Sequence, residues 1–199
     1  MKREDGYSVA GFPNGHAPPM PVTLSPADDR FFTDAPLADF SFVVDNEFEP
    51  AIARPVDMSP RRTVPAWRKA YGFDAEACRG HVDAPDRMLC VARRGDALAG
   101  YVAVAAHWNG FALVEDIAVA VAHRRRGVAS TLLHAAEDWA RGRGLPGLML
   151  ETQNNNVAAC RLYERHGFVL RGVDAWLYRG LDANTREIAL FYYLDLSPP

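Results

Sequence analysis

A basic, glycine-containing turn stands between a predicted strand that ends at Val119 and a predicted helix. Such a turn collects unpaired backbone N–H groups and the positive end of a helix dipole, which together favour an anion such as a diphosphate. A solvated basic turn is the alternative, and the spacing is not that of a P-loop. Gly127 and Ala129 lack bulk, so an anion could approach the backbone. The candidate anion-binding residues are Arg124, Arg125, Arg126, Gly127, Val128, Ala129 and Ser130.

Three carboxylates lie in apolar strand patterns, at Glu115, Asp116 and Glu151. An unpaired charge in such a run is costly, so each carboxylate needs a partner. A cationic substrate could be that partner, and a structural ion pair is the alternative. An amine with a pKa of about 10.4 is almost fully protonated at pH 7, so a carboxylate could also accept its proton. Neighbouring strand residues point to opposite faces, which predicts that Glu115 and Asp116 do not line the same pocket wall.

The elements that must position these residues alternate through the second half of the chain. Apolar residues recur at helical spacing from Val128 to Trp139, which predicts an amphipathic helix ending at Gly142. The order of the elements predicts an α/β domain with a mixed sheet and crossover helices, because several strands come first and are followed by strand–helix–strand–helix–strand. The other predicted elements are strands at 40–44, 88–93, 98–106, 111–119, 148–152, 168–170 and 187–196, helices at 65–71 and 157–166, and a hairpin turn at 94–96.

Residues 1–36 differ in composition from the remainder, 37–199. Proline and glycine recur there with little periodicity, so a Pro-rich, partly disordered arm without regular elements is expected. A segment that packs on the domain is the alternative. The total length of 199 residues fits one domain plus such an arm. The residues responsible are Gly6, Gly11, Pro13, Gly15, Pro18, Pro19, Pro21, Pro26 and Pro36.

Composition excludes several classes of protein. A net charge of −3 argues against a nucleic-acid binder, whose affinity depends on neutralising phosphates. No apolar stretch approaches the roughly 18 residues of a membrane span, and no apolar segment follows the first basic residues. The histidines show no metal-ligand spacing, so no metal is predicted. Cys78, Cys90 and Cys160 are odd in number and widely spaced, which fits a reducing cytoplasmic location.

These motifs together resemble the GNAT family of N-acetyltransferases. The resemblance rests on Ile117-Ala118-Val119, the turn from Arg124 to Ala129, Leu150-Glu151, Asn156 and residues 162–168. A finer resemblance to streptothricin acetyltransferases runs from about Gly100 to Leu196. It includes Trp108-Asn109, residues 114–119 and 147–153, Leu177-Tyr178 and residues 187–193. The resemblance implies a GNAT-type mixed, mostly antiparallel twisted sheet with flanking helices, and makes 37–199 the N-acetyltransferase domain.

The same resemblance implies acetyl-CoA as co-substrate and gives the residues expected to bind it. The pantetheine arm would lie beside the strand at Ile117, Ala118 and Val119. The pyrophosphate would meet backbone amides from Arg125 to Ser130, and Asn156 would contact the cofactor. Plain helix capping is the alternative for Asn156. Tyr163 would protonate the departing CoA thiolate, with core packing as its alternative.

For the acceptor, the resemblance implies a small cationic amine, namely the β-lysine amino group of streptothricin, and hence antibiotic resistance. The amine would attack directly in a ternary complex. Glu151 would be the base, acting through water, while Glu115 and Asp116 would recognise the amine. Trp108 and Asp174 are further candidate substrate contacts. Two alternatives stay open: another amine (a peptide N-terminus, an aminoglycoside or a polyamine), or an acyl-CoA-binding module without turnover. A homodimer is possible because family members often dimerise.

Overall fold

A seven-stranded sheet forms the body of the computed structural model, which describes residues 20–48 and 61–197. The strand order is β1-β4-β5-β6-β7-β9-β8. Neighbouring strands are antiparallel except β6 and β7, which run parallel. The mixed, mostly antiparallel α/β sheet is therefore confirmed. The strands are β1 (Val22–Pro26), β4 (Arg87–Arg94), β5 (Ala97–Ala106), β6 (Ala112–Val119), β7 (Gly147–Gln153), β8 (Val169–Asp174) and β9 (Ala189–Asp195).

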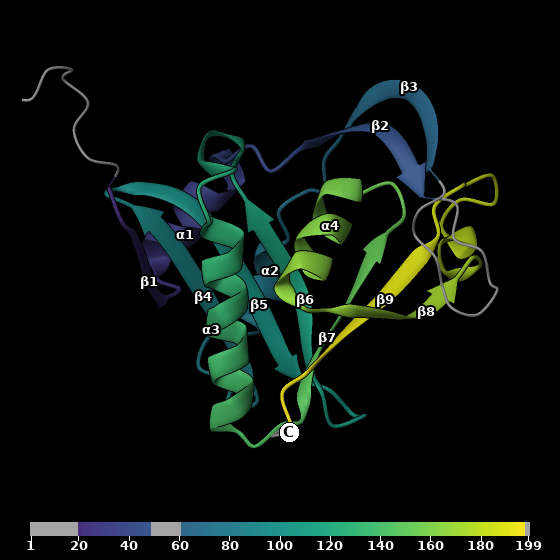
Figure 1. Ribbon diagram of the computed structural model, residues 1–199. Coiled ribbons are helices and arrows are strands. Elements are labelled where there is room, and N and C mark those ends of the chain that lie inside the picture. The colour runs from purple at the N-terminus through teal and green to yellow at the C-terminus, as the bar shows by residue number, and fades with distance from the viewer. Residues whose placement is uncertain (1–19, 49–60, 198–199) are drawn as a thin grey trace, which may run out of the picture.

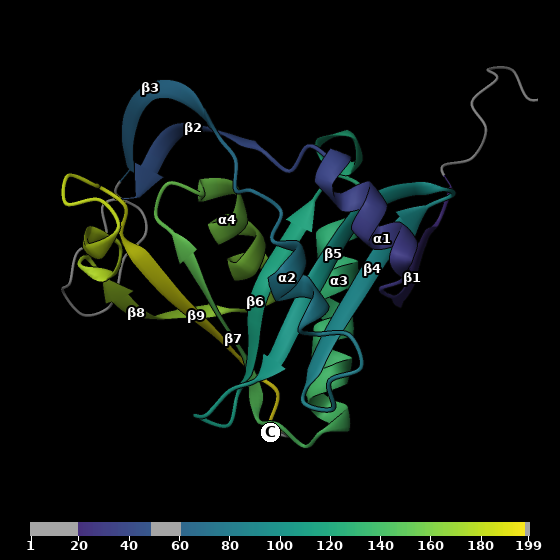
Figure 2. The same ribbon diagram turned by 180° about the vertical axis from the view of Figure 1, so that it is seen from behind.

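Helices cover both faces of this sheet (Figure 1, Figure 2). α3 (Val128–Gly142) and α4 (Val157–His166) lie on one face, and α1 (Asp29–Asp34) and α2 (Ala75–Arg79) on the other. Side chains of β4 and β5 alternate between the two faces, as the pleat of a strand requires. Cys90, Ala92, Val102 and Val104 belong to the core under α3 and α4, whereas Leu89, Val91, Tyr101 and Ala103 pack with α1 and α2.

The parallel strands β6 and β7 separate near the middle of the molecule. They pair only over Ala112–Val114 and Leu148–Leu150. Beyond these pairs the strands diverge, and α4 lies over the opening (Figure 1). Backbone N–H and C=O groups of β6 on that side have no strand partner within the described ranges. Such groups are free to hydrogen-bond an extended ligand.

A separate two-stranded sheet, β2 (Phe42–Phe48) with β3 (Arg61–Lys69), lies at the open end of the split (Figure 1). The helix predicted at 65–71 is therefore wrong. Proline near a helix start suggested that helix, but Pro65 falls in the irregular part of the β2–β3 pairing, between the pairs Val44–Trp67 and Asn46–Thr63. A residue without an N–H is tolerated where the ladder is interrupted.

Part of the predicted N-terminal arm is regular structure. β1 pairs with β4 from Val22 to Pro26, and α1 buries Phe31 completely. Asp28 caps α1 by accepting a 2.9 Å hydrogen bond from the backbone N–H of Phe31. Pro26 is tolerated because it ends an edge strand. The expectation of no regular elements is thus wrong for residues 20–36, and residues 1–19 lie outside those described.

The elements that position the motifs are confirmed, with small shifts at their ends. They are the hairpin of β4 and β5, strands β6, β7, β8 and β9, and helices α3 and α4. The short helix α2 and the 3-10 turns at Ala35–Leu37, Val121–His123 and Leu177–Gly180 were not predicted. Among the described residues, no helix has the length and apolarity needed to cross a membrane.

Candidate active site

The turn between β6 and α3 forms an open backbone cradle. Gly127 caps α3 with φ 81°, and Arg125 also has a positive φ of 59°. Within residues 20–48 and 61–197, no side chain caps the first turn of α3, so its N–H groups are left to another acceptor. Apart from its neighbours along the chain, no heavy atom of the described residues stands within 4 Å of the position that a Cβ on Gly127 would occupy. The cradle therefore has both the donors and the space for an anion.

A groove of about 490 Å³ runs from this cradle along β6 to α4. Its lining includes most of the predicted cofactor residues: Ile117, Ala118, Val119, Arg124, Arg125, Gly127, Val128, Ala129, Ser130, Asn156 and Tyr163. Arg126 is exposed and is not part of the lining. Four further lining residues were not predicted from the sequence. They are Phe40, just before β2, Phe42, in β2, His123, and Arg165, on α4. No local motif marks these residues, because only tertiary folding brings them to the groove.

Arg124 supports the groove more than it supplies charge to it. Its Nε donates to the carbonyl of Val119 at 3.1 Å, and its Nη2 donates to the carbonyl of Phe40 at 2.9 Å. Burial lowers the pKa of this guanidinium. Arg124 therefore ties the end of β6 to the segment before β2, while Arg125 remains exposed beside the cradle.

A second cavity, of about 370 Å³, brings the three predicted carboxylates together. Glu115, Asp116 and Glu151 all belong to its lining. The two cavities share Ile117, Asn156 and Tyr163, so they meet where β6 and β7 separate. The sequence analysis gave no site role to the other polar lining residues of the second cavity, which are Tyr71, Asp74, Cys78, His81, Thr152 and Gln153.

The prediction that Glu115 and Asp116 cannot share a pocket wall is wrong. Ala103 of β5 pairs with Asp116, but the next β5 residue, Val104, pairs with Val114. Glu115 is therefore an extra residue in a β-bulge, which breaks the simple alternation of side chains. The bulge allows both carboxylates to line one cavity.

These two carboxylates have different partners. An oxygen of Glu115 lies 2.8 Å from Nε2 of His81 and 3.5 Å from Nη1 of Arg87. Asp116 instead accepts a 2.5 Å hydrogen bond from the hydroxyl of Tyr101. Burial raises the pKa of Asp116, against the lowering effect of the bonds from Tyr101 and the backbone of Ile117. Glu115 thus has two basic side chains as partners, whereas the partner of Asp116 is the hydroxyl of Tyr101.

Glu151 lies in a chain of hydrogen bonds that the sequence did not predict. The hydroxyl of Tyr178 donates to Glu151 and accepts a 2.8 Å bond from the amide of Gln153, whose oxygen accepts from Tyr71. Burial is the main cause that raises the pKa of Glu151, and the bond from Tyr178 opposes it. The chain fixes the Glu151 carboxyl at the edge of the cavity.

Two predicted substrate contacts lie outside the cavity lining. Asp174 accepts from the backbone N–H groups of Trp176 at 2.7 Å and Leu177 at 3.1 Å. It therefore shapes the turn that carries Tyr178. Trp108 is 89% exposed in the turn between β5 and β6. The structure brings neither side chain to the three carboxylates.

Tyr163 and Asn156 stand at the junction of the two cavities. The Tyr163 ring is 5% exposed and packs near Phe168 and Tyr192, with ring centroids 5.8 and 5.9 Å away. Burial raises the pKa of its hydroxyl well above the ordinary value, so the phenol stays protonated at neutral pH. Asn156 caps α4, the role given as the alternative to a cofactor contact, and accepts a 3.3 Å bond from the N–H of Ala159. Capping does not exclude a cofactor contact, because Asn156 also lines both cavities.

Comparison with known proteins agrees with this geometry. Streptothricin acetyltransferase A of Bacillus subtilis is 46% identical over 94 residues, which cover 47% of this chain and 54% of that protein. Streptothricin acetyltransferase of Escherichia coli is 37% identical over 133 residues, or 66% of this chain and 72% of the relative. A crystal structure of a candidate streptothricin acetyltransferase from Bacillus anthracis with acetyl coenzyme A has a TM-score of 0.79 and 30% identity, covering 90% of this chain and all of that one.

These matches differ in how much of each relative they include. The aligned segment spans about half the length of the Bacillus subtilis relative, whereas the structural match spans the whole of the Bacillus anthracis chain. The model of the acetyltransferase (GNAT) family matches residues 53–168, more than half of this chain, and includes β6, α3, β7 and α4. On this evidence the chain belongs to the acetyltransferase (GNAT) family.

Proposed function

We propose that the protein is an acetyl-CoA-dependent N-acetyltransferase that acetylates the β-lysine amino group of streptothricin and so confers resistance. One observation carries the proposal: a groove with a helix N-terminus and a cavity with three carboxylates meet at Tyr163. The acetyl coenzyme A in the Bacillus anthracis structure supports the cofactor. The streptothricin acetyltransferases among the relatives support the acceptor.

The groove fits the parts of acetyl-CoA in order. The open cradle at Gly127 and the backbone N–H groups from Val128 to Ser130 would hold the pyrophosphate. Arg125 and Arg165 line the same groove and would add positive charge. Ile117–Val119 of β6 would bind the pantetheine arm as an added strand, since β7 has parted from β6 there. This path leads the thioester to Tyr163.

The carboxylate cavity would capture the acceptor amine and remove its proton. Glu115 and Asp116 would attract the cation, which would give Asp116 a positive partner in addition to its hydrogen bond from Tyr101. Glu151 would accept the proton, directly or through water. Its raised pKa brings this carboxyl closer to neutral pH, which improves it as a general base. Tyr178 would hold Glu151 in place.

Acetyl transfer would then proceed in one ternary complex. The amine nitrogen would bond to the acetyl carbon as the carbon–sulfur bond breaks, and Tyr163 would donate its proton to the leaving sulfur. Backbone N–H groups near Val119 would stabilise the negative charge on the carbonyl oxygen. Burial raises the pKa of the Cys78 thiol to about 11. Although Cys78 lines the cavity, this thiol is protonated at neutral pH, which supports direct transfer over an acyl-cysteine.

The decisive experiment measures thiol release from acetyl-CoA by the purified protein. Streptothricin is compared with free β-lysine, an aminoglycoside, a polyamine and a peptide with a free N-terminus, and the acetylated nitrogen is located by mass spectrometry. We expect turnover selective for streptothricin at its β-lysine amine. Turnover confined to another amine would keep the chemistry and remove the resistance role. Binding of acetyl-CoA without turnover on any amine would contradict the proposal that the protein is an acetyltransferase.

A further inference from the structure

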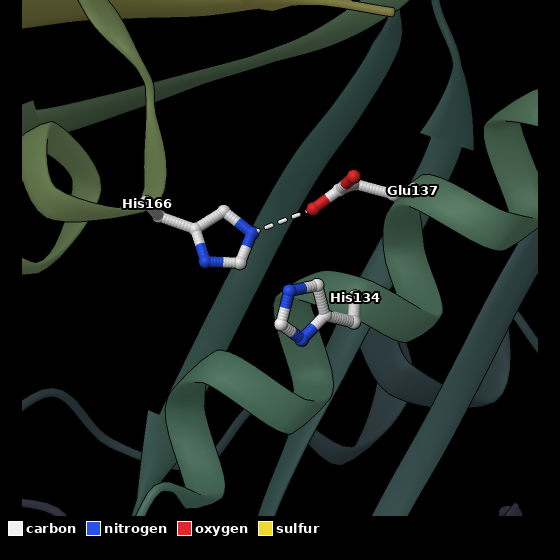
Figure 3. Close-up of side chains that lie close together, drawn as sticks. All are labelled: His134, Glu137 and His166. Carbon is white, nitrogen blue, oxygen red and sulfur yellow. Dashed lines mark hydrogen bonds and ion pairs between the residues drawn. The ribbon is translucent and has the colours of Figure 1, made fainter.

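A cluster of two histidines and one glutamate joins α3 to α4 outside both cavities (Figure 3). His134 and Glu137 lie three positions apart on α3, which places them on one face of the helix. His166 is the last residue of α4, 29 residues beyond Glu137. Figure 3 shows the three side chains directed into one space. None of them contributes to the proposed acetyl transfer.

The geometry of the cluster is compact. Nε2 of His166 lies 2.7 Å from Oε1 of Glu137, and the His134 and His166 ring centroids are 4.7 Å apart. One nitrogen of each histidine and one carboxylate oxygen all lie within 4.8 Å of one another. The Glu137 and His166 side chains are 11% and 6% exposed, whereas His134 is exposed to solvent. Two ligands are thus fixed in the protein, and the third lies at the surface.

We propose that His134, Glu137 and His166 bind a divalent transition-metal ion, with zinc as the first candidate. Two imidazoles and one carboxylate are a ligand set that zinc uses, at bond lengths of about 2.0–2.2 Å. Tetrahedral ligands at that distance are separated by roughly 3.3 Å. The His166–Glu137 pair would need to open by about half an ångström, and the exposed His134 ring would turn inward. A water molecule would take the fourth position on the solvent side.

The surroundings of Glu137 support this role. Its second oxygen, Oε2, accepts a 2.9 Å bond from Nη2 of Arg141, one turn further along α3. Nη1 of Arg141 also lies 3.7 Å from Oδ1 of Asp138, so the guanidinium interacts with two carboxylates. Oε1 is therefore left to face the two imidazoles. A ligating carboxylate is commonly held through its other oxygen in this way, which fixes its orientation.

Metal binding would connect two helices that also line the cofactor groove. The first turn of α3 and the body of α4 both contribute to that lining, and the cluster joins the two helices further along. Sequence analysis did not predict such a site, because histidines on two different helices have no characteristic spacing. The expectation of no metal is thereby replaced by this proposal.

The test is calorimetric titration of zinc chloride into tag-free, chelator-treated protein, with cobalt(II) absorption as a spectroscopic check. We expect one zinc per chain, and magnesium should not bind, because it prefers oxygen ligands. His134→Ala should weaken zinc binding at least about tenfold. His107→Ala is the matched control, because His107 lies in the β5–β6 turn away from the cluster and should leave zinc binding unchanged.

Thermal unfolding separates loss of a ligand from loss of the fold. His134 is exposed, so His134→Ala should melt at the wild-type temperature without metal. At a hundred times its Kd, zinc should raise the melting temperature of the wild type by about 5–10 °C. At the same zinc concentration, His134→Ala and His166→Ala should each show at most about half of that shift, as expected for binding weakened at least tenfold. The proposal is overturned if wild type binds no zinc at millimolar concentration, or if both histidine variants bind it as tightly as the wild type. In that event the cluster is only the hydrogen-bonded pair of His166 and Glu137 with an adjacent ring.

Discussion

At the scale of single residues, Tyr163 has the position that most restricts its role. It lines both cavities, it is buried, and its hydroxyl stays protonated. Tyr163→Phe removes one proton donor without changing the ring. We expect kcat to fall by about 10²–10⁴ with little change in the KM for acetyl-CoA, as for loss of a general acid. Steady-state kinetics on both substrates measures kcat and the two KM values separately. An unchanged kcat would mean that Tyr163 serves only core packing.

The base role of Glu151 predicts a change in pH dependence. Because burial raises the pKa of Glu151, the carboxyl is protonated, and unable to accept a proton, over a wider acidic range than usual. Activity should rise with pH as this group ionises. Glu151→Gln should remove that rising limb and lower kcat/KM by at least about 100-fold. The hydrogen bond from Tyr178 lowers the pKa of Glu151. Tyr178→Phe removes this bond and should therefore move the rising limb to higher pH without abolishing it. Identical pH–rate profiles for wild type and Glu151→Gln would transfer the base role to another carboxyl.

Asp116 predicts a conflict between stability and function. Its pKa in the folded state is raised, mainly by burial, so the folded protein resists its ionisation. The resulting cost is absent at low pH and appears as the pH rises through the folded-state pKa. Asp116→Asn keeps an acceptor for Tyr101 and should therefore melt higher than wild type at pH 8, but not at pH 4. The KM for the cationic acceptor should rise.

A matched variant controls this prediction. Glu115→Gln should give no such gain, because Glu115 already lies beside His81 and Arg87. Thermal melts of the wild type and both variants across this pH range provide the comparison. An Asp116→Asn protein that is less stable than wild type at pH 8 would contradict the argument.

At the scale of elements, the strand–turn–helix unit around Gly127 carries the cofactor prediction. Gly127→Asp puts bulk and negative charge into the open cradle and strains a residue with positive φ. We expect the KM for acetyl-CoA to rise by about 10- to 100-fold, equivalent to roughly 1.4–2.8 kcal/mol. Gly110→Asp is a matched control, since Gly110 also has a positive φ (89°) and open space around it but lies in the β5–β6 turn. Equal effects of the two variants on the KM for acetyl-CoA would contradict the prediction that the cradle at Gly127 binds the cofactor.

The elements also show how far sequence reasoning reaches. β6, α3, β7 and α4 were predictable because apolar periodicity, caps and the family motif agree along each of them. β3 was not, because its proline suggested a helix start and only pairing with β2 makes it a strand. The bulge at Glu115 leaves no local signal either, since it depends on the register between β5 and β6. Local patterns therefore predicted the lining of the groove at Gly127 better than the lining of the cavity that holds the three carboxylates.

At the scale of the whole molecule, the site depends on how two sheets are held together. The seven-stranded sheet provides the split between β6 and β7, and Phe42 of the two-stranded sheet lines the groove beside it. Backbone and amide bonds between Phe48 and Asn154 join the sheets. Lys69 of β3 adds an ion pair with Glu187, which also accepts a 3.0 Å bond from Asn155. These contacts come from distant parts of the chain, so the sequence did not predict them.

The Lys69–Glu187 pair gives the prediction at this scale. The two side chains are 10% and 25% exposed, so removal of one partner leaves a poorly hydrated charge. Lys69→Met keeps the apolar stem, and we expect it to cost about 3 kcal/mol and lower the melting temperature by about 6–12 °C. Arg68→Met is the neighbouring control: its pair with Asp39 is 65% and 55% exposed and should contribute less than about 1 kcal/mol. Hydrogen exchange should quicken in β2 and β3 of Lys69→Met but not in β4 and β5. Similar losses in the two variants would mean that the two-stranded sheet is held by its backbone contacts, and that the acceptor side of the site does not depend on this ion pair.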